Sequence, residues 1–113
     1  WDGVGELSLP GVGTLSFVAQ NGGLNWAKLQ ASDSCLQVRF RAGGERILLN
    51  GMHRSVKKLM QQWLIPPWLR GQVPLLYLGD RLIAVVGHGL ADDMKTLADE
   101  PGSWPELSAD NVE

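Results

Sequence analysis

The stretch RSVKKLMQQWLIPP, residues 54–67, decides the fold of this chain. Its apolar residues recur at i, i+3, i+4, i+7 and i+8, namely Val56, Leu59, Met60, Trp63 and Leu64. This spacing predicts one amphipathic helix. Ser55 is a suitable N-cap, although Asn50 or His53 could serve instead. The Pro66-Pro67 pair cannot continue a helix, so the helix must end before it.

Strands are predicted on both sides of this helix. Downstream, Pro74–Leu78 and Arg81–Val86 flank Gly79-Asp80, which predicts a hairpin of nearly continuous apolar strands covered on both faces. Upstream, Cys35–Arg41 alternates, so that Leu36, Val38 and Phe40 are expected to face inward. A turn at residues 42–45 and a return strand at Arg46–Leu49 are expected to follow.

The first 34 residues are rich in glycine and favour short strands. Glu6–Leu9 and Thr14–Ala19 read as two strands joined by a turn at Pro10-Gly11. Asn21–Gly23 reads as a turn, and Leu24–Leu29 is ambiguous, with a strand packed through Trp26 as one interpretation.

The last 23 residues carry turn-forming and acidic residues and little periodicity. Met94, Leu97 and Ala98 allow one helical turn, but the segment as a whole is expected to be mostly loose. The predicted organisation is therefore N-terminal strands at 1–34, a core at 35–90 and an acidic tail at 91–113. The predicted fold class is α+β, with mainly antiparallel strands packed against one principal amphipathic helix.

Composition narrows the function classes. A chain of 113 residues fits one domain. Its single cysteine, Cys35, cannot form an internal disulfide, which favours a reducing compartment and hence the cytoplasm. The apolar runs are too short to cross a membrane, and no secretory signal opens the chain. Because the first residue is Trp1 and not Met, we expect the sequence to be a piece of a longer protein.

The net charge of −2 hides two opposed blocks. Residues 39–70 carry seven basic residues and only Glu45 as an acid, whereas residues 92–113 carry seven acids and only Lys95 as a base. A concentrated basic block is typical of proteins that contact nucleic acid.

The basic residues at Arg54, Lys57 and Lys58 are spaced i, i+3 and i+4, which on a helix would place like charges together at a small cost in stability. Phosphate binding would explain that cost, although a merely solvated basic face is an equal alternative. Arg39 and Arg41 share one strand face, where they either bind phosphate or discourage edge pairing of the sheet. Arg46, after the next turn, favours phosphate binding.

No motif for covalent chemistry is found. The glycine pairs form neither a phosphate loop nor a dinucleotide fingerprint, and no nucleophile elbow, paired carboxylates or Cys/His couple occurs. We therefore expect no catalytic, cofactor or metal residue here. His53 is interpreted as a structural hydrogen-bonding residue and His88 as incidental. Trp63 and Trp68 are both expected to pack in the core, with base stacking as the alternative for Trp68.

Several blocks in one order resemble a known family. They are RFRAGGER at 39–46, KKLMQ at 57–61, IPPWLR at 65–70 and PLLYLGDRLIAV at 74–85. Between about residues 36 and 87 the chain resembles the C-terminal domain of bacterial tRNA(Ile)-lysidine synthetase. The resemblance implies a mixed fold shared with a domain of the phenylalanyl-tRNA synthetase β chain. It implies a parent ligase that attaches lysine to the wobble cytidine of isoleucine tRNA, using ATP bound in a separate N-terminal catalytic domain.

The resemblance also implies partners and site residues. The partners are the acceptor stem of isoleucine tRNA and the parent's own catalytic domain, with no membrane. The residues expected to contact tRNA are Lys57, Lys58, Arg70, Arg54, Arg46 and Arg41. For Arg46 and Arg70, ion pairing with Glu45 or Asp80 is an alternative. A protein-interaction or purely structural module without a nucleic-acid role is the alternative function.

Overall fold

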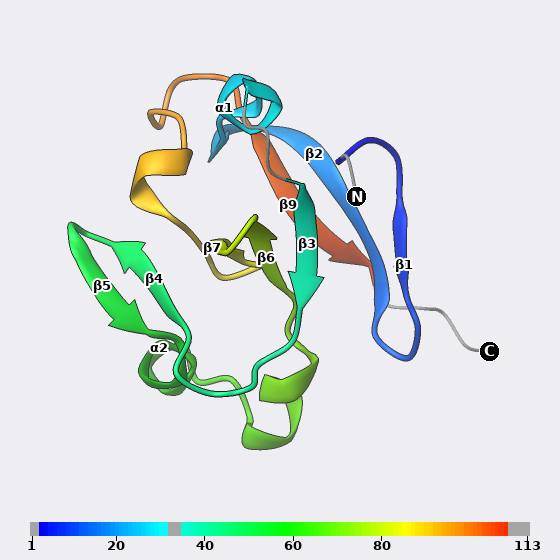
Figure 1. The fold of residues 1–113 in the computed structure, drawn as a ribbon, viewed down its shortest axis with the longest axis vertical. Coiled ribbons are helices and arrows are strands. Elements are labelled where there is room, and N and C mark those ends of the chain that lie inside the picture. The colour runs from blue at the N-terminus through cyan, green and yellow to red at the C-terminus, as the bar shows by residue number, and fades with distance from the viewer. Residues whose placement is uncertain (1–2, 32–34, 109–113) are drawn as a thin grey trace.

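The computed structural model describes residues 3–31 and 35–108, and every pair of strands in these ranges is antiparallel (Figure 1). The elements follow in the order β1 (Leu7–Leu9), β2 (Gly13–Leu24), α1 (Trp26–Ala31), β3 (Leu36–Arg39), β4 (Arg46–Leu49), β5 (Met52–Ser55), α2 (Val56–Gln62), η1 (Pro67–Gln72), β6 (Leu75–Leu78), β7 (Arg81–Val85), β8 (Gly89–Leu90), η2 (Asp92–Met94) and β9 (Ser103–Ser108).

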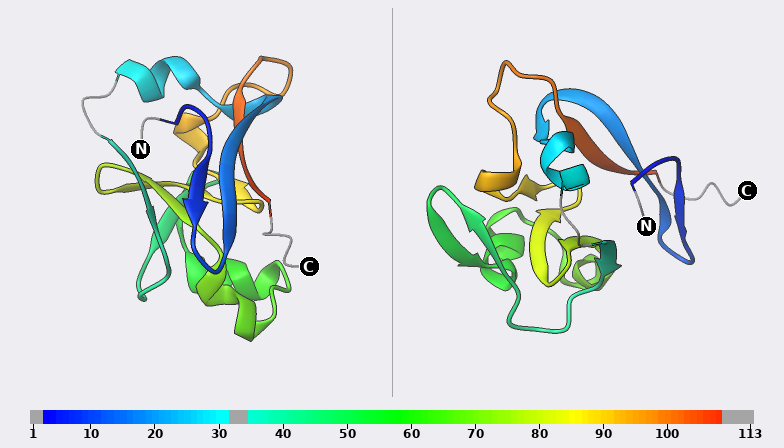
Figure 2. Two further views of the ribbon diagram at one scale, coloured as in Figure 1. Left: turned by 90° about the vertical axis from the view of Figure 1, so that its right-hand side faces the viewer. Right: turned by 45° about the horizontal axis from the view of Figure 1, so that its top comes forward.

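These strands form three sheets, ordered β1-β2-β9, β3-β6-β7-β8 and β4-β5. In Figure 1 the β1-β2-β9 sheet lies on one side, the β4–β5 hairpin on the other, and the four-stranded sheet between them. Figure 2 shows α2 and η1 together at one end of the molecule and α1 at the opposite end. The predicted α+β class is confirmed.

The core is centred on the β6–β7 hairpin. Leu75, Leu76 and Ile83 are fully buried, and their neighbours on the same strands are buried as well. Since successive residues of a strand point to opposite faces, both faces of this hairpin are covered, as predicted. The hairpin turns at Gly79-Asp80 and pairs Leu78 with Arg81.

Helix α2 begins as predicted and ends sooner. The Ser55 hydroxyl accepts a hydrogen bond from the Lys58 amide at 3.5 Å, which confirms Ser55 as the N-cap. Leu64 lies beyond the helix with φ 58° and is 85% exposed, so its predicted place on the buried face is wrong. Its amide donates to Gln61 and the Ile65 amide donates to Met60, which is the Schellman arrangement of a helix C-terminus.

The predicted return strand is real but pairs differently. β4 does not pair with β3, which pairs with β6; instead β4 pairs with β5. The connection between β4 and β5 is Asn50-Gly51, with φ of 52° and 76°. Positive φ at both positions is the conformation of a type I′ turn, for which Asn-Gly is the preferred sequence. Phe40, expected to face inward, lies beyond the end of β3 and is 39% exposed.

One N-terminal prediction is also wrong, and the structure resolves a segment that the sequence left ambiguous. Within 24–29, Leu24 ends β2 and Trp26–Leu29 belong to helix α1, not to a strand. The side chain of Asn25, just before this helix, accepts a hydrogen bond from the Lys28 amide at 3.2 Å. Asn21–Gly23 does not turn the chain but lies at an irregularity within β2. A β-carbon at Gly23 would lie 2.8 Å from the Ser103 backbone, so glycine here permits close approach of β9.

Residues 91–108 of the predicted tail pack onto the rest of the fold, contrary to expectation. β9 pairs along β2 from Thr14 to Leu24, and Pro105 is fully buried. The helical turn expected around Met94 is the 3-10 turn η2, with Met94 buried. The remainder of the predicted tail, 109–113, lies outside the described residues.

Candidate nucleic-acid interface

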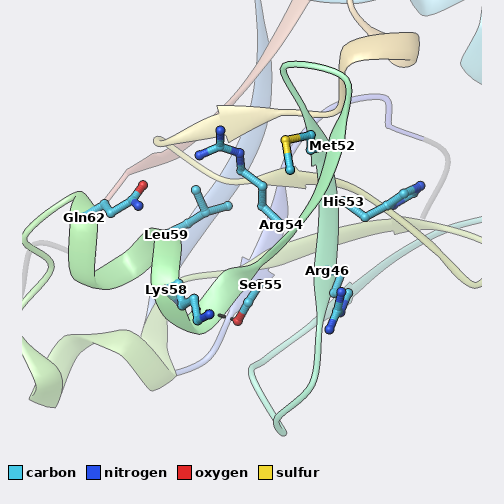
Figure 3. Close-up of a pocket in the computed structure, with 8 residues that line it drawn as sticks. All are labelled: Arg46, Met52, His53, Arg54, Ser55, Lys58, Leu59 and Gln62. Atoms are coloured by element: carbon cyan, nitrogen blue, oxygen red, sulfur yellow. Dashed lines mark hydrogen bonds between the residues drawn. The ribbon is translucent and has the colours of Figure 1, made fainter.

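The β4–β5 hairpin carries the centre of the basic surface. Its register pairs Arg46 with Ser55 and Ile47 with Arg54. Arg54 and Met52 project to the side of the hairpin that faces α2, whereas Arg46 and His53 project to the other side (Figure 3). The type I′ turn fixes this register, and the register fixes which arginine lies on which side.

Arg54 has an unusual environment. It is half-buried, and its Nε atom is buried without a hydrogen-bond partner among the residues that the structure describes. An unpaired buried donor costs about 1–3 kcal/mol. In Figure 3 the guanidinium group lies above α2, on the side of the helix where Leu59 and Gln62 project. Arg54 therefore carries one donor that the described part of the fold leaves unpaired.

A pocket of about 250 Å³ brings together three of the six predicted residues: Arg46, Arg54 and Lys58. The remaining lining residues are neutral or histidine: Met52, His53, Ser55, Leu59 and Gln62. No carboxylate lines it, and the His53 side chain, predicted to be a structural residue, is exposed at its edge. An anion is the ligand that such a lining favours.

A second depression of about 510 Å³ adjoins the first and shares Arg46 and His53. It also includes Asp80 and Arg81, each of which has an ionic partner in the fold. Asp80 lies 3.5 Å from Arg39, and Arg81 pairs with Asp93. Arg46 thus lines both depressions, and no ion pair is found for it among the described residues.

Lys57 and Lys58 are both exposed on the first turn of α2, but only Lys58 lines the pocket. Arg54 belongs to β5, so the predicted helix face of Arg54, Lys57 and Lys58 is wrong. The three residues are close because the strand leads directly into the helix.

Arg41 and Arg70 do not line either pocket. Arg70 is half-buried and its Nε donates a hydrogen bond to the Ile65 carbonyl at 2.9 Å, which fixes the loop after α2. Arg41 is half-buried near Glu45. Partial burial would raise the pKa of Glu45, but hydrogen bonds from the Ala42 and Gly43 amides, with the charge of Arg41, hold this pKa below its usual value.

The ion-pair alternative for Arg46 and Arg70 finds no support among the described residues. The ion partner of Asp80 is Arg39, which also lies 4.4 Å from the centre of the Tyr77 ring and donates to Gln37 at 2.9 Å. Glu45 instead accepts from backbone amides. Arg39 therefore supports the fold, and Arg46 stays available to a ligand.

Comparison with known proteins identifies the family. The sequence profile of the family described as "TilS substrate C-terminal domain" matches residues 36–106. This chain belongs to that family. The TilS C-terminal match extends into β9, beyond residue 87, where the resemblance was predicted to end.

Relatives agree with the TilS assignment. The chain is 42% identical over 106 residues to the tRNA(Ile)-lysidine synthase of Coxiella burnetii (strain RSA 493 / Nine Mile phase I), which covers 90% of this chain and 23% of that protein. It is 48% identical over 60 residues to the tRNA(Ile)-lysidine synthase of Legionella pneumophila (strain Paris), which covers 53% of this chain and 14% of that protein. The chain therefore spans less than a quarter of the length of these relatives.

A solved structure shows the same fold. The structure described as "Crystal structure of TILS C-terminal domain" superposes with a TM-score of 0.70 at 20% sequence identity, covering 96% of this chain and 92% of that one. This similarity confirms the mixed architecture expected for the TilS C-terminal domain.

The predictions for Trp68 and His88 of this TilS domain are wrong. Trp68, expected in the core, is 76% exposed. Trp63 packs at the edge of the core and stacks on His88, so His88 is not incidental. No group of three or more metal-ligating side chains was found in residues 3–31 and 35–108. No helix within these ranges is long and apolar enough to cross a membrane.

Proposed function

We propose that this chain is the tRNA-binding domain of a tRNA(Ile)-lysidine synthase and that it engages the acceptor stem of isoleucine tRNA. The parent enzyme would be a cytoplasmic ligase that attaches lysine to the wobble cytidine. Its ATP site and catalytic residues would lie in another part of the polypeptide. The names of the relatives support the parent activity.

The observation that carries this proposal is the pocket lined by Arg46, Arg54 and Lys58 without a carboxylate. Arginine forks and lysine ammonium groups are the usual ligands of backbone phosphates. Duplex RNA is recognised mostly through its shape, phosphates and 2′-hydroxyls, so a cationic surface without a base code suits a stem. Lys57, Arg41 and Arg70 would contribute more general attraction around it.

Binding of a labelled acceptor-stem hairpin RNA, followed by fluorescence anisotropy, tests the proposal. If about four phosphates are neutralised, raising the salt from ~50 to ~200 mM weakens binding roughly a hundredfold. Lys58→Glu is expected to reduce affinity by about tenfold or more and to lower the salt slope by about one. Lys57→Glu should have a smaller effect, and the double variant the largest.

Lys28→Glu is the matched control. Lys28 is exposed on α1, where its ammonium group donates a hydrogen bond to the Asp93 carbonyl at 2.9 Å. The Lys28→Glu substitution changes the net charge by the same amount as Lys58→Glu. Equal losses for Lys28→Glu and Lys58→Glu would indicate only nonspecific attraction. Unchanged affinity in the Lys57→Glu/Lys58→Glu variant would leave the protein-interaction or structural alternative.

A further inference from the structure

A third pocket lies at the tip of the β4–β5 hairpin, away from the arginines. Its volume is about 330 Å³. Its lining comes from β2, the tip of the β4–β5 hairpin, the end of α2, the β7–β8 turn, β8, the segment around η2, and β9. The lining residues are Gly22, Leu49, Asn50, Trp63, His88, Gly89, Leu90, Asp92, Lys95 and Trp104. Three of these residues carry aromatic rings, a composition typical of sites for planar ligands.

The aromatic part of this pocket is already ordered. The rings of Trp63 and His88 are stacked with centroids 5.6 Å apart and an angle of 17° between their planes. Gly89 lies beside this pair, since a β-carbon there would approach the Trp63 ring to 3.3 Å. Trp104 contributes a second, half-buried indole from β9. A ring entering the pocket therefore meets a fixed stacking surface.

The polar part is fixed as well and carries no net charge. One Asp92 carboxylate oxygen accepts a hydrogen bond from the Gly51 amide at 2.8 Å, and the other lies 3.6 Å from the Lys95 ammonium. The Asn50 amide completes the polar lining. Opposite charges paired in this way favour a neutral ligand with donors and acceptors on its edge, in contrast to the all-cationic lining around Arg54.

We infer that this pocket binds an unpaired nucleobase of the RNA, stacked against the Trp63–His88 pair with its edge toward Asn50, Asp92 and Lys95. Unstacked bases of RNA are commonly recognised in this way, by aromatic stacking and hydrogen bonds at the base edge. The inference rests on the proposed function, because it assumes that RNA is the partner.

The position of the pocket relative to the cationic site supports one continuous contact. Leu49 lines the base pocket and its cross-strand partner Met52 lines the pocket that holds Arg54. The three steps along β4 from Arg46 to Leu49 span about 10 Å of strand. Neighbouring nucleotides of one strand can cover that separation, with a phosphate at one site and a base at the other.

Two RNAs and one exposed side chain test the inference. The RNAs are a blunt hairpin and the same hairpin with a single-stranded 3′ extension, and affinity is measured by anisotropy. The unmodified chain should bind the extended RNA about tenfold to a hundredfold more tightly, as expected for stacking of one base. His88→Ala should remove this advantage and leave the affinity for blunt RNA unchanged, and His88→Phe should restore most of it.

Trp68→Ala is the matched control, because Trp68 is an exposed aromatic residue outside the pocket. It should leave the advantage of the extended RNA intact. Equal binding of the two RNAs by the unmodified chain would overturn the base pocket while leaving the cationic site standing. An equal loss with Trp68→Ala, or loss of both RNAs with His88→Ala, would overturn it too. Failure to bind even the blunt RNA at low salt would overturn the proposed function itself.

Discussion

Replacing Arg54 by methionine should make the domain more stable and weaken its binding to RNA. The Arg54 Nε is buried and finds no acceptor among the residues that the structure describes. Methionine is unbranched and adaptable, and it can fill much of the same volume over Leu59 without a polar atom. The variant therefore removes an unsatisfied donor and preserves much of the packing.

The magnitude follows from the two opposed terms. Leaving a buried donor unpaired costs about 1–3 kcal/mol, and the loss of the outer part of the side chain subtracts a fraction of that gain. A net increase of about 1 kcal/mol in the free energy of unfolding is expected, which for a domain of this size raises the melting temperature by about 3–6 °C. RNA affinity should fall about tenfold, and the salt slope should fall by about one, because one phosphate contact is lost.

Urea denaturation followed by tryptophan fluorescence measures the first quantity, and anisotropy with the acceptor-stem hairpin measures the second. Arg46→Met is the matched control, since Arg46 is exposed and lines the same pocket. It should weaken RNA binding similarly and change the stability by less than about 0.5 kcal/mol. A clearly destabilised Arg54→Met variant with unchanged RNA affinity would show that Arg54 supports the fold and not the ligand.

Two further predictions concern the region after α2 and the His88 ring. The free energy of unfolding should be about 0.5–1 kcal/mol higher for Leu64→Gly than for Leu64→Ala. Both variants lose the same exposed side chain, but only glycine relieves the positive φ of 58°. Equal stability of the two variants in thermal melts would refute this explanation. His88 is largely exposed, but partial burial holds its pKa below the ordinary value of about 6.5. The unfolded chain therefore takes up a proton more readily, so this residue's contribution to stability is full above pH 6.5 and declines as the pH falls below it. An NMR titration should give a pKa below 6.5 that rises in Trp63→Leu, and an unchanged pKa would contradict shielding by the indole.

Local signals predicted part of the fold well. The α2 periodicity, the Ser55 cap and the β6–β7 hairpin each depend on residues close in sequence, and all three are confirmed. The Asn50-Gly51 signal was equally local and was missed, although it explains why β4 pairs with β5. The partner of β3 is β6, some forty residues away, and no local pattern specifies such a pairing.

The prediction of a loose tail is wrong because the sequence of this segment resembles that of a loop. Proline and acidic residues are unfavourable within most strands, and β9 contains Pro105 and Glu106. However, β9 lies at the edge of the β1-β2-β9 sheet, where a strand pairs on one side only and tolerates proline. The family profile includes this strand up to residue 106.

The candidate site was only partly predictable, because the sequence does not show which cations have partners elsewhere in the fold. Residue type indicated cations between 39 and 70, but not which of them have internal partners. Arg70 binds the Ile65 carbonyl and Arg39 pairs with Asp80, whereas Arg46, Arg54 and Lys58 all line one pocket. Such distinctions depend on tertiary contacts.

Two acidic residues of the tail make contacts within the fold that the net charge does not reveal. Counted as charge, it cancels the basic block and argues against RNA binding. In the structure, Asp92 accepts a hydrogen bond from Gly51 at the hairpin turn, and Asp93 pairs with Arg81. The hydrogen bond from the Gly51 amide holds the pKa of Asp92 below its usual value. Part of the tail's negative charge thus positions the hairpin that presents Arg46 and Arg54, and does not compete with RNA for them.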